Sequence, residues 1–364
     1  MGFNCGIVGL PNVGKSTLFN AMTQANAPAA NYPFCTIDHH NGIVAVPDRR
    51  LDDIASKFGP LSVIPTTVEF VDIAGLVEGA SKGEGLGNKF LGHIRATDAI
   101  AHVVRCFDDP SIVHTYGAAD PVNDIEIITT ELVLADLDSV TKRFDKIASA
   151  AKIGNAEAKK EFPSLEKIKI HVETGKPVRS LELDKADHEL CHTLGLITSK
   201  PLFYVLNANE SDIKTPSDKI KKVLDYAKKD NAPAVIVAAS IESELATLSP
   251  EDRKAFLDDL GLEEPGLHRV IRTGYALLNL ITYFTAGKKE VRAWTIHNGD
   301  TAPQAAGKIH SDFERGFIRA ETYHYDDLMK YGNEQAVKAA GRLRSEGADY
   351  LVQDGDIMNF RFNV

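Results

Sequence analysis

Nine consecutive residues near the start of the chain have the types and spacing of a phosphate-binding loop. Residues 9–17 read Gly-Leu-Pro-Asn-Val-Gly-Lys-Ser-Thr, which matches the pattern G-x-x-x-x-G-K-[ST]. Gly9 and Gly14 allow backbone conformations and close approaches that a Cβ atom would block. The apolar run before the loop predicts a buried strand, and the residues after it predict a helix whose free N–H groups favour an anion. The segment therefore predicts a site for the β- and γ-phosphates of a nucleoside triphosphate.

Separate roles can be predicted within this loop. Its backbone N–H groups face the phosphates, and the Lys15 ammonium reaches the β- and γ-phosphate oxygens, where it also serves catalysis. The Ser16 hydroxyl is a predicted ligand of Mg²⁺. Asn12 suits a K⁺ ion held between the phosphates in place of an arginine finger; the alternative is an asparagine that binds no ion. The predicted nucleotide-binding residues of the loop are Asn12, Val13, Gly14, Lys15, Ser16 and Thr17.

A second motif supplies a carboxylate and a glycine for the same phosphates. Residues 68–75 form a β-rich run that ends in D-x-x-G, with Asp72 and Gly75. In switch proteins this aspartate holds Mg²⁺ through water and the glycine N–H contacts the γ-phosphate, so loss of that phosphate releases the following loop. Thr36, in a polar loop, stands where a switch threonine completes the Mg²⁺ shell. The predicted metal residues are Ser16, Thr36 and Asp72.

The residue that would orient the attacking water is missing from its usual position. Ras-type switches carry a glutamine directly after D-x-x-G, and this chain has Leu76 there. A leucine cannot orient water, so hydrolysis is expected to be slow unless a polar group comes from elsewhere. His114 is one candidate for a catalytic group; the alternative is an ordinary surface histidine.

The segment predicted to read the base departs from the guanine pattern. A predicted strand is followed by Asn207, Ala208 and Glu210 in an N-x-x-E arrangement. Guanine-specific switches have N-K-x-D, whose aspartate accepts hydrogen bonds from guanine. The longer Glu210 and the short Ala208 therefore put strict guanine specificity in doubt. A further predicted strand brings two more residues to the edge of the base, Ala239 and Ser240.

Six strand signals separated by helical patterns predict a mostly parallel α/β sheet. They lie at 3–9, 42–46, 68–72, 99–105, 202–206 and 234–238. Residues of about 124–198 show apolar positions at helical spacing, which predicts an inserted antiparallel, coiled-coil-like helical arm. Between Lys142 and Lys169 the arm has eight Lys/Arg and four Asp/Glu. This local excess suits RNA phosphate, although an ordinary solvated helix face is the alternative.

The C-terminal part of the chain changes character. A helix is predicted at 267–280, and from about residue 281 β-rich segments with an Asp354-Gly355 turn predict a small α+β domain. The expected organisation is therefore a P-loop domain of residues 1–280, with the arm inserted in it, followed by a domain of residues 281–364.

Composition limits the class of protein further. The chain has 364 residues, 43% of them hydrophobic, and a formal net charge of −10, which suits two or three domains. No apolar run approaches the roughly 18 residues of a membrane span, and the first predicted strand leaves no room for a signal peptide, so we expect a cytoplasmic protein without a membrane partner. The four cysteines have no C-x-x-C spacing, which argues against a zinc site or a disulfide framework.

Several longer stretches together resemble the YchF/Obg-like ATPase family. They are the phosphate loop and residues 32–37, 72–88, 102–107 and 301–321, the last of which is similar to the family's TGS domain. The resemblance extends over essentially the whole chain. It implies a translation-factor-class P-loop protein with a TGS domain at its C-terminal end.

The same resemblance implies an activity and partners. It implies a switch that prefers ATP to GTP, hydrolyses it slowly and associates with ribosomes or RNA. It also implies that the segment from Asn207 to Glu210 is the family's altered base motif, that Thr36 binds Mg²⁺ and that an apolar residue is usual at Leu76. We expect a monomer.

Three alternatives stay open from the residues themselves. One is a GTP-specific switch GTPase. Another is a small-molecule or nucleotide kinase, which would need an arginine-bearing lid and an acceptor pocket. The third is a non-catalytic scaffold that binds nucleotide for stability and docks partners through the arm and the end domain.

Overall fold

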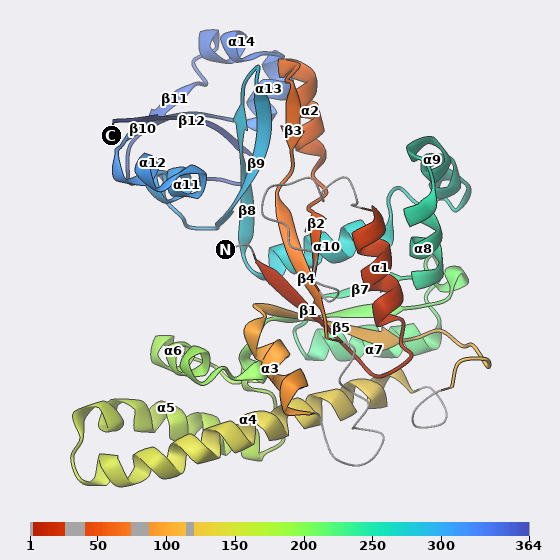
Figure 1. The fold of residues 1–364 in the computed structure, drawn as a ribbon, viewed down its shortest axis with the longest axis vertical. Helices are drawn as coiled ribbons and strands as arrows, with labels where there is room; N and C mark the ends of the chain where they lie inside the picture. Colours follow the sequence, from red (N-terminus) through yellow and green to blue (C-terminus); the bar gives the residue numbers. More distant parts are fainter. Residues whose placement is uncertain (1–2, 26–40, 74–86, 114–119, 364) are drawn as a thin grey trace. The chain divides into compact units, whose positions relative to one another are not determined.

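The structure, a computed structural model, describes residues 3–25, 41–73, 87–113 and 120–363. They form two compact units, one of Met1–Ile43 with Glu69–Thr273 and one of Val44–Val68 with Gly274–Val364. Figure 1 traces the chain through both. The predicted division between residues 280 and 281 stays a prediction. Residues 44–68, which that division assigns to the first domain, fold with the C-terminal residues.

A six-stranded sheet lies mainly in the first unit. Its strands are β1 (Asn4–Val8), β2 (Asn41–Ala45), β4 (Thr67–Asp72), β5 (Ala99–Arg105), β6 (Leu202–Asn207) and β7 (Ala234–Val237), in the order β2-β4-β1-β5-β6-β7. β1 pairs in parallel with β4 and β5, β5 with β6, and β6 with β7. Every residue of β5 and β6 is buried, as expected for strands covered on both faces. All six predicted strands are present, and the predicted α/β fold is confirmed.

Helices cover both faces of this sheet. They are α1 (Lys15–Ala25), α3 (Asn88–Ala96), α7 (Asp218–Lys229), α8 (Ala239–Thr247) and α10 (Gly266–Leu277), and α9 (Pro250–Asp259) packs against α8 through Leu257. Figure 1 shows α1 and α10 on one side of the sheet and α7 on the other. The helix predicted at 267–280 ends earlier than expected, at Leu277. Asn279 takes a left-handed conformation with φ of 53°, and a strand begins at Leu280.

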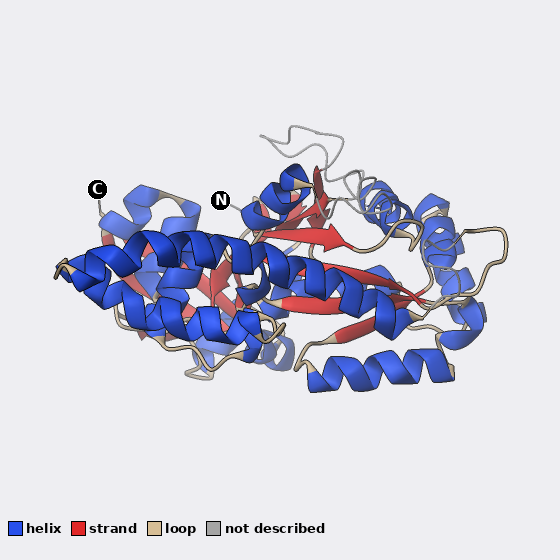
Figure 2. Ribbon diagram, turned by 90° about the horizontal axis from the view of Figure 1, so that it is seen from below, coloured by secondary structure: helices blue, strands red, loops and turns tan. Residues whose placement is uncertain are grey.

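The predicted helical arm is confirmed. It consists of α4 (Pro121–Lys152), α5 (Ala156–Glu173), the 3₁₀ turns η3 (Val178–Ser180) and η4 (Ile197–Ser199), and α6 (Lys185–Leu194). Figures 1 and 2 show α4 and α5 side by side and antiparallel. Gly154 reverses the chain between them with φ of 97°, and fully buried residues such as Val140 and Leu165 form their shared core. No helix in the described part of the chain combines the length and apolar character that crossing a membrane requires.

A second six-stranded sheet, with the order β11-β10-β12-β8-β9-β3, forms the other unit. Its strands are β3 (Ser62–Ile64), β8 (Leu280–Ala286), β9 (Glu290–His297), β10 (Phe317–His324), β11 (Arg344–Glu346) and β12 (Asp356–Phe362). Its helices are α2 (Arg49–Phe58), α11 (Ala302–Ile309), α12 (Ser311–Arg315), α13 (Tyr325–Tyr331) and α14 (Glu334–Ala339). α2 buries Leu51 and Ile54 in one core cluster with Phe284 and Tyr323. This burial is the reason that residues 44–68 belong to the C-terminal unit.

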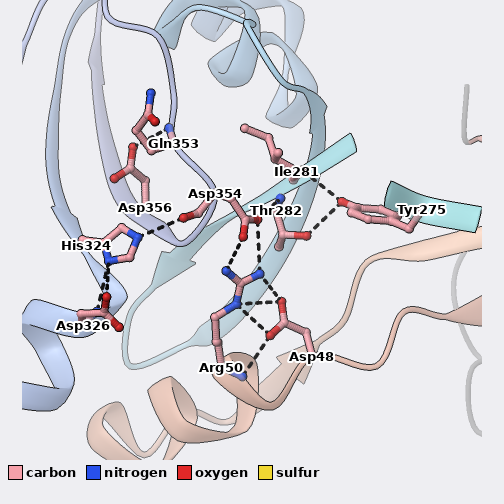
Figure 3. A network of polar contacts seen from close by, with 10 residues as sticks. All are labelled: Asp48, Arg50, Tyr275, Ile281, Thr282, His324, Asp326, Gln353, Asp354 and Asp356. Carbon is pink, nitrogen blue, oxygen red and sulfur yellow. Dashed lines mark hydrogen bonds and ion pairs between the residues drawn. The ribbon is translucent and has the colours of Figure 1, made fainter. Parts of the chain in front are cut away.

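A polar network joins α2 to the turn before β12 (Figure 3). The Arg50 guanidinium donates to the carboxylates of Asp48 and Asp354, and its closest approach to each is 2.7 Å. Asp354 Oδ1 also accepts from the backbone N–H of Thr282 at 2.9 Å, and its carbonyl oxygen lies 3.0 Å from His324 Nε2. Both chain segments of the second unit are thus joined at this turn. The turn itself was predicted from the Asp354-Gly355 pair.

Asp136 of α4 fixes the base of the arm. Its side chain is fully buried. Oδ1 accepts from the backbone N–H of Ile197 at 2.8 Å, and Oδ2 accepts from the backbone N–H and hydroxyl of Thr198 at 2.7 and 2.6 Å. One carboxylate therefore satisfies three donors in the turn that leads into β6.

Replacing this carboxylate should destabilise the protein strongly. Asp136→Ala leaves three buried donors without an acceptor, so we expect a loss of about 3 kcal/mol or more in the free energy of unfolding. Urea unfolding followed by circular dichroism measures it. Asp138→Ala is the matched control on the same helix, because Asp138 is exposed and forms a surface ion pair with Lys142. The loss in this variant should stay within about 0.5 kcal/mol. Equal losses in the two variants would contradict the role assigned to Asp136.

Candidate nucleotide-binding site

The phosphate loop joins β1 to α1 and lies against β5 and the end of β6. A Cβ atom on Gly9 would be 2.4 Å from the carbonyl oxygen of Val103 in β5. A Cβ atom on Gly14 would be 2.2 Å from Asn207 Nδ2 at the end of β6, and Gly14 has φ of 96°. Both glycines are therefore required by the close packing of the loop, as the motif predicts.

Lys15 is buried under the loop, with 6% of its surface exposed. Its ammonium donates to the carbonyl oxygen of Leu10 at 2.6 Å. Burial lowers the pKa of this lysine to about 8, although the nearby Asp72 carboxylate acts in the opposite direction. The ammonium is thus poorly compensated by the protein, and phosphate oxygens would provide the missing negative charge.

Two of the predicted metal residues lie together. Ser16 is at the start of α1 and Asp72 at the end of β4, and the Ser16 hydroxyl donates to Asp72 Oδ2 at 3.2 Å. Mg²⁺ usually binds one or two protein oxygens and completes its shell with water and substrate phosphates. A hydroxyl and a carboxylate beside a phosphate loop fit that requirement. Three predicted residues lie outside the described part of the chain: Thr36, Gly75 and His114.

A cavity of about 540 Å³ opens beside the phosphate loop, a suitable size for a small ligand. Most residues predicted to bind nucleotide line it: Asn12, Gly14, Thr17, Asn207, Ala208, Glu210, Ala239 and Ser240. Val13 is buried behind the loop, with 2% of its surface exposed. The phosphate and base segments, which are far apart in sequence, therefore share one cavity.

Asn207 holds these two segments together. Its Nδ2 donates to the carbonyl oxygen of Val13 at 2.9 Å, and its Oδ1 accepts from the backbone N–H of Ala239 at 3.0 Å. The side chain is buried. Both ends of the amide are therefore used to join the phosphate loop to the first residue of α8, while the exposed Glu210 side chain lines the cavity.

Comparisons with known proteins agree with this geometry. A family model described as a 50S ribosome-binding GTPase matches residues 4–152, and a YchF GTPase C-terminal model, described as a protein of unknown function, matches residues 280–363. A curated relative from Haemophilus influenzae, named ribosome-binding ATPase YchF, is 56% identical over 364 residues and 100% of both chains. This chain belongs to the YchF family. Relatives with the same name from Escherichia coli O157:H7 and Bacillus subtilis are 54% and 53% identical, also over 100% of both chains.

A solved YchF structure supports the same assignment. It is titled the YchF GTPase of Schizosaccharomyces pombe, is 39% identical and superposes with a TM-score of 0.90 over 99% of this chain and 98% of that chain. The resemblance stated from sequence is therefore confirmed for the family and for the fold. The roles of individual site residues in this YchF-family chain stay predictions.

One wall of the cavity was missed by the sequence analysis. It comes from the segment after β5 and contains Phe107, Asp108, Asp109 and Ile112. β5 pairs in parallel with β6, and the backbone N–H of Cys106 donates to the carbonyl oxygen of Asn207 at 2.8 Å. Since carboxyl ends of neighbouring parallel strands share one sheet edge, the place of this segment beside the base motif could have been inferred from strand order.

The P-loop asparagine also contacts this missed segment. Asn12 takes a left-handed conformation with φ of 60°, and its Nδ2 donates to the carbonyl oxygen of Val113 at 3.2 Å. The Asn12 side-chain amide therefore has a protein partner in this structure, and a K⁺ ion at Asn12 stays a prediction.

The lowered pKa of Lys15 should make nucleotide affinity fall at alkaline pH. Above about pH 8 the free protein loses the lysine proton, whereas a bound triphosphate favours the charged form. The bound state then holds more protons than the free state, so the dissociation constant should rise with pH by up to about tenfold per pH unit. Titration with a fluorescent ATP analogue and Mg²⁺ from about pH 7 to about pH 9.5 measures this slope.

Lys15→Arg is the control for that titration. Its guanidinium stays charged over the whole range, so the variant should show a flat profile whatever its absolute affinity. A flat profile in the unmodified protein would contradict the role of the lysine proton.

Proposed function

We propose that this chain is a slowly hydrolysing, Mg²⁺-dependent ATPase that acts as a nucleotide-controlled switch on the ribosome. The observation that carries the proposal is the shared cavity, in which the phosphate loop meets the base segment through Asn207. Ser16, which belongs to the phosphate loop, forms a hydrogen bond with Asp72. In this proposal Lys15 binds the phosphates, Thr36 completes the Mg²⁺ shell and the Gly75 amide senses the γ-phosphate.

Slow turnover is part of the proposal. Phosphoryl transfer to water depends mainly on positioning and charge stabilisation, and Leu76 supplies neither. A partner, a K⁺ ion beside Asn12 or the His114 side chain would then raise the rate. Mg²⁺ held by Ser16, Thr36 and Asp72 would offset the negative charge of the phosphates, while the chain's own residues hold the phosphates in place.

Adenine is the proposed base. The usual lysine of the base motif is Ala208, and the carboxylate that would bond guanine is on the longer Glu210 side chain. The curated relatives carry the name ATPase, which supports this choice. The rival candidate is a GTPase, because the matching family model and the solved YchF structure carry that name.

The proposed partner is the ribosome, contacted as protein or as RNA, and the protein would work as a cytoplasmic monomer. The names of the curated relatives support ribosome binding. The local excess of Lys and Arg between Lys142 and Lys169 on the arm suits RNA phosphate within a chain of net charge −10.

Base preference should be measured by titrating nucleotide-free protein with ATP and GTP. We expect ATP to bind at least about tenfold more tightly, which corresponds to about 1.4 kcal/mol. The double variant Ala208→Lys/Glu210→Asp should shift that ratio towards GTP, because it restores the guanine-reading pair. Glu244→Asp, an equivalent change on the exposed face of α8, should leave it unchanged. A preference for GTP in the unmodified protein would overturn the ATPase assignment.

Switch behaviour should appear as nucleotide-dependent ribosome binding. We expect the fraction that co-sediments with ribosomes to differ by about threefold or more between a non-hydrolysable ATP analogue and no nucleotide. Lys15→Ala should abolish that difference, because it removes the phosphate-binding ammonium. A scaffold would keep its ribosome binding unchanged with or without nucleotide, and that result would replace the switch by the scaffold.

A further inference from the structure

The phosphate loop and the base segment line two sides of the cavity, and residues 107–113, which we call the third wall, form another. The third wall is held by a buried arginine. Arg105 is the last residue of β5 and has 3% of its surface exposed. Nη1 and Nη2 donate to the carbonyl oxygen of Ile112 at 3.1 Å, and Nη2 donates to that of Asp109 at 3.1 Å. A longer bond from Nε reaches the carbonyl oxygen of Phe107 at 3.5 Å. The guanidinium carbon also lies 4.5 Å from the centre of the Phe107 ring.

This use of an arginine is unusual. Buried guanidinium groups are normally paired with carboxylates. Within the described residues no carboxylate forms an ion pair with Arg105, and its hydrogen bonds there all go to backbone carbonyls of the third wall. Because the rigid Arg105 guanidinium donates several hydrogen bonds to one short segment, it fixes the backbone path of that segment.

The third wall is also held from outside. Lys219 of α7 forms an ion pair with the Asp108 carboxylate at 2.5 Å. Asp109 Oδ1 accepts from the backbone N–H and hydroxyl of Ser111 at 2.8 and 2.6 Å. Asn12 reaches the carbonyl oxygen of Val113. Arg105 is the buried centre of this arrangement, and the other contacts lie at its rim.

The position of the third wall decides which part of a nucleotide it would meet. The phosphates belong to the loop of residues 9–17, and the third wall shares its cavity with the base segment that follows β6. Phe107 and Ile112 are half-buried there and offer apolar surface. A wall at this place faces the base and ribose.

We propose that Arg105 is a positioning residue of the nucleotide site, which keeps the third wall preformed against the base and ribose before any ligand arrives. The inference rests on the proposed nucleotide binding. Binding is weakened when a loop must become ordered at the same time as the ligand binds. A preformed wall avoids this cost, so nucleotide should bind more weakly when Arg105 is removed. The loss falls on the base and ribose, and the phosphate loop keeps its own contacts.

Inorganic tripolyphosphate separates these contributions, because it has the phosphates of ATP without base or ribose. Calorimetric titration with Mg²⁺ should show that Arg105→Gln weakens ATP binding about tenfold or more and tripolyphosphate binding less than about twofold. Arg105→Lys, which keeps a charge but reaches fewer carbonyls, should fall between. Lys15→Ala should weaken both ligands.

Arg253→Gln is the matched control. Arg253 also donates to backbone carbonyls, those of Leu245 at 3.0 Å and Leu248 at 3.5 Å, but it does not line the cavity. It should leave both affinities unchanged. Hydrogen exchange adds a second readout: Arg105→Gln should speed exchange in residues 108–113 without nucleotide, and saturating ATP should restore slow exchange.

Ile112→Ala is the second test if Arg105→Gln does not fold. It removes apolar side-chain atoms from the third wall and leaves the arginine in place. It should weaken ATP and spare tripolyphosphate. Equal weakening of both ligands in either variant, or unchanged ATP affinity, would overturn the inference while the proposed ATP binding stood. Absence of ATP binding in the unmodified protein would overturn the proposed function itself, and the inference with it.

Discussion

The close approach of the phosphate loop to β5 and to the end of β6 is the constraint on which the rest of the site depends. Gly9 and Gly14 have no Cβ atom because the Val103 carbonyl and the Asn207 amide occupy that space. The approach lets one buried amide, that of Asn207, bond both to the loop and to the start of α8. The segments predicted to bind the phosphates and the base are thereby fixed relative to each other without a ligand, which is an arrangement that favours affinity.

The second unit depends on a different constraint. Like the first unit, it is formed by two separate segments of the chain. The chain leaves the nucleotide sheet after β2 and returns to it at β4, and between those strands it forms α2 and β3. Leu51 and Ile54 enter the core of the C-terminal residues, and Arg50 bonds the turn at Asp354. The C-terminal residues alone would lack the core helix α2 and the edge strand β3. This unit therefore requires residues 44–68, which follow the phosphate loop in the sequence.

Sequence reasoning succeeded where the signal is local. The phosphate loop, the six strands of the nucleotide sheet and the arm have motifs or periodicities within about ten to thirty residues. It missed features that depend on distant pairing: β3 has only three residues and pairs with β9, more than two hundred residues further along the chain. It also missed the third wall, because Phe107 and Ile112 form no motif until β5 and β6 are known to be neighbours. The early end of α10 came from Asn279, whose left-handed conformation an apolar periodicity does not reveal.

The two buried cations of the site show how residue type follows task. Lys15 donates to the backbone carbonyl of Leu10, and burial of its ammonium lowers its pKa. A compact ammonium on a flexible stem can exchange that carbonyl for phosphate oxygens. Arg105 instead bonds several carbonyls of one segment with a rigid fork, and a change of partner would release the wall. In the proposed function, the cation that changes partner when nucleotide binds is a lysine, and the cation that keeps its partners is an arginine. Exchanging the two residue types would therefore impair each position for a different reason.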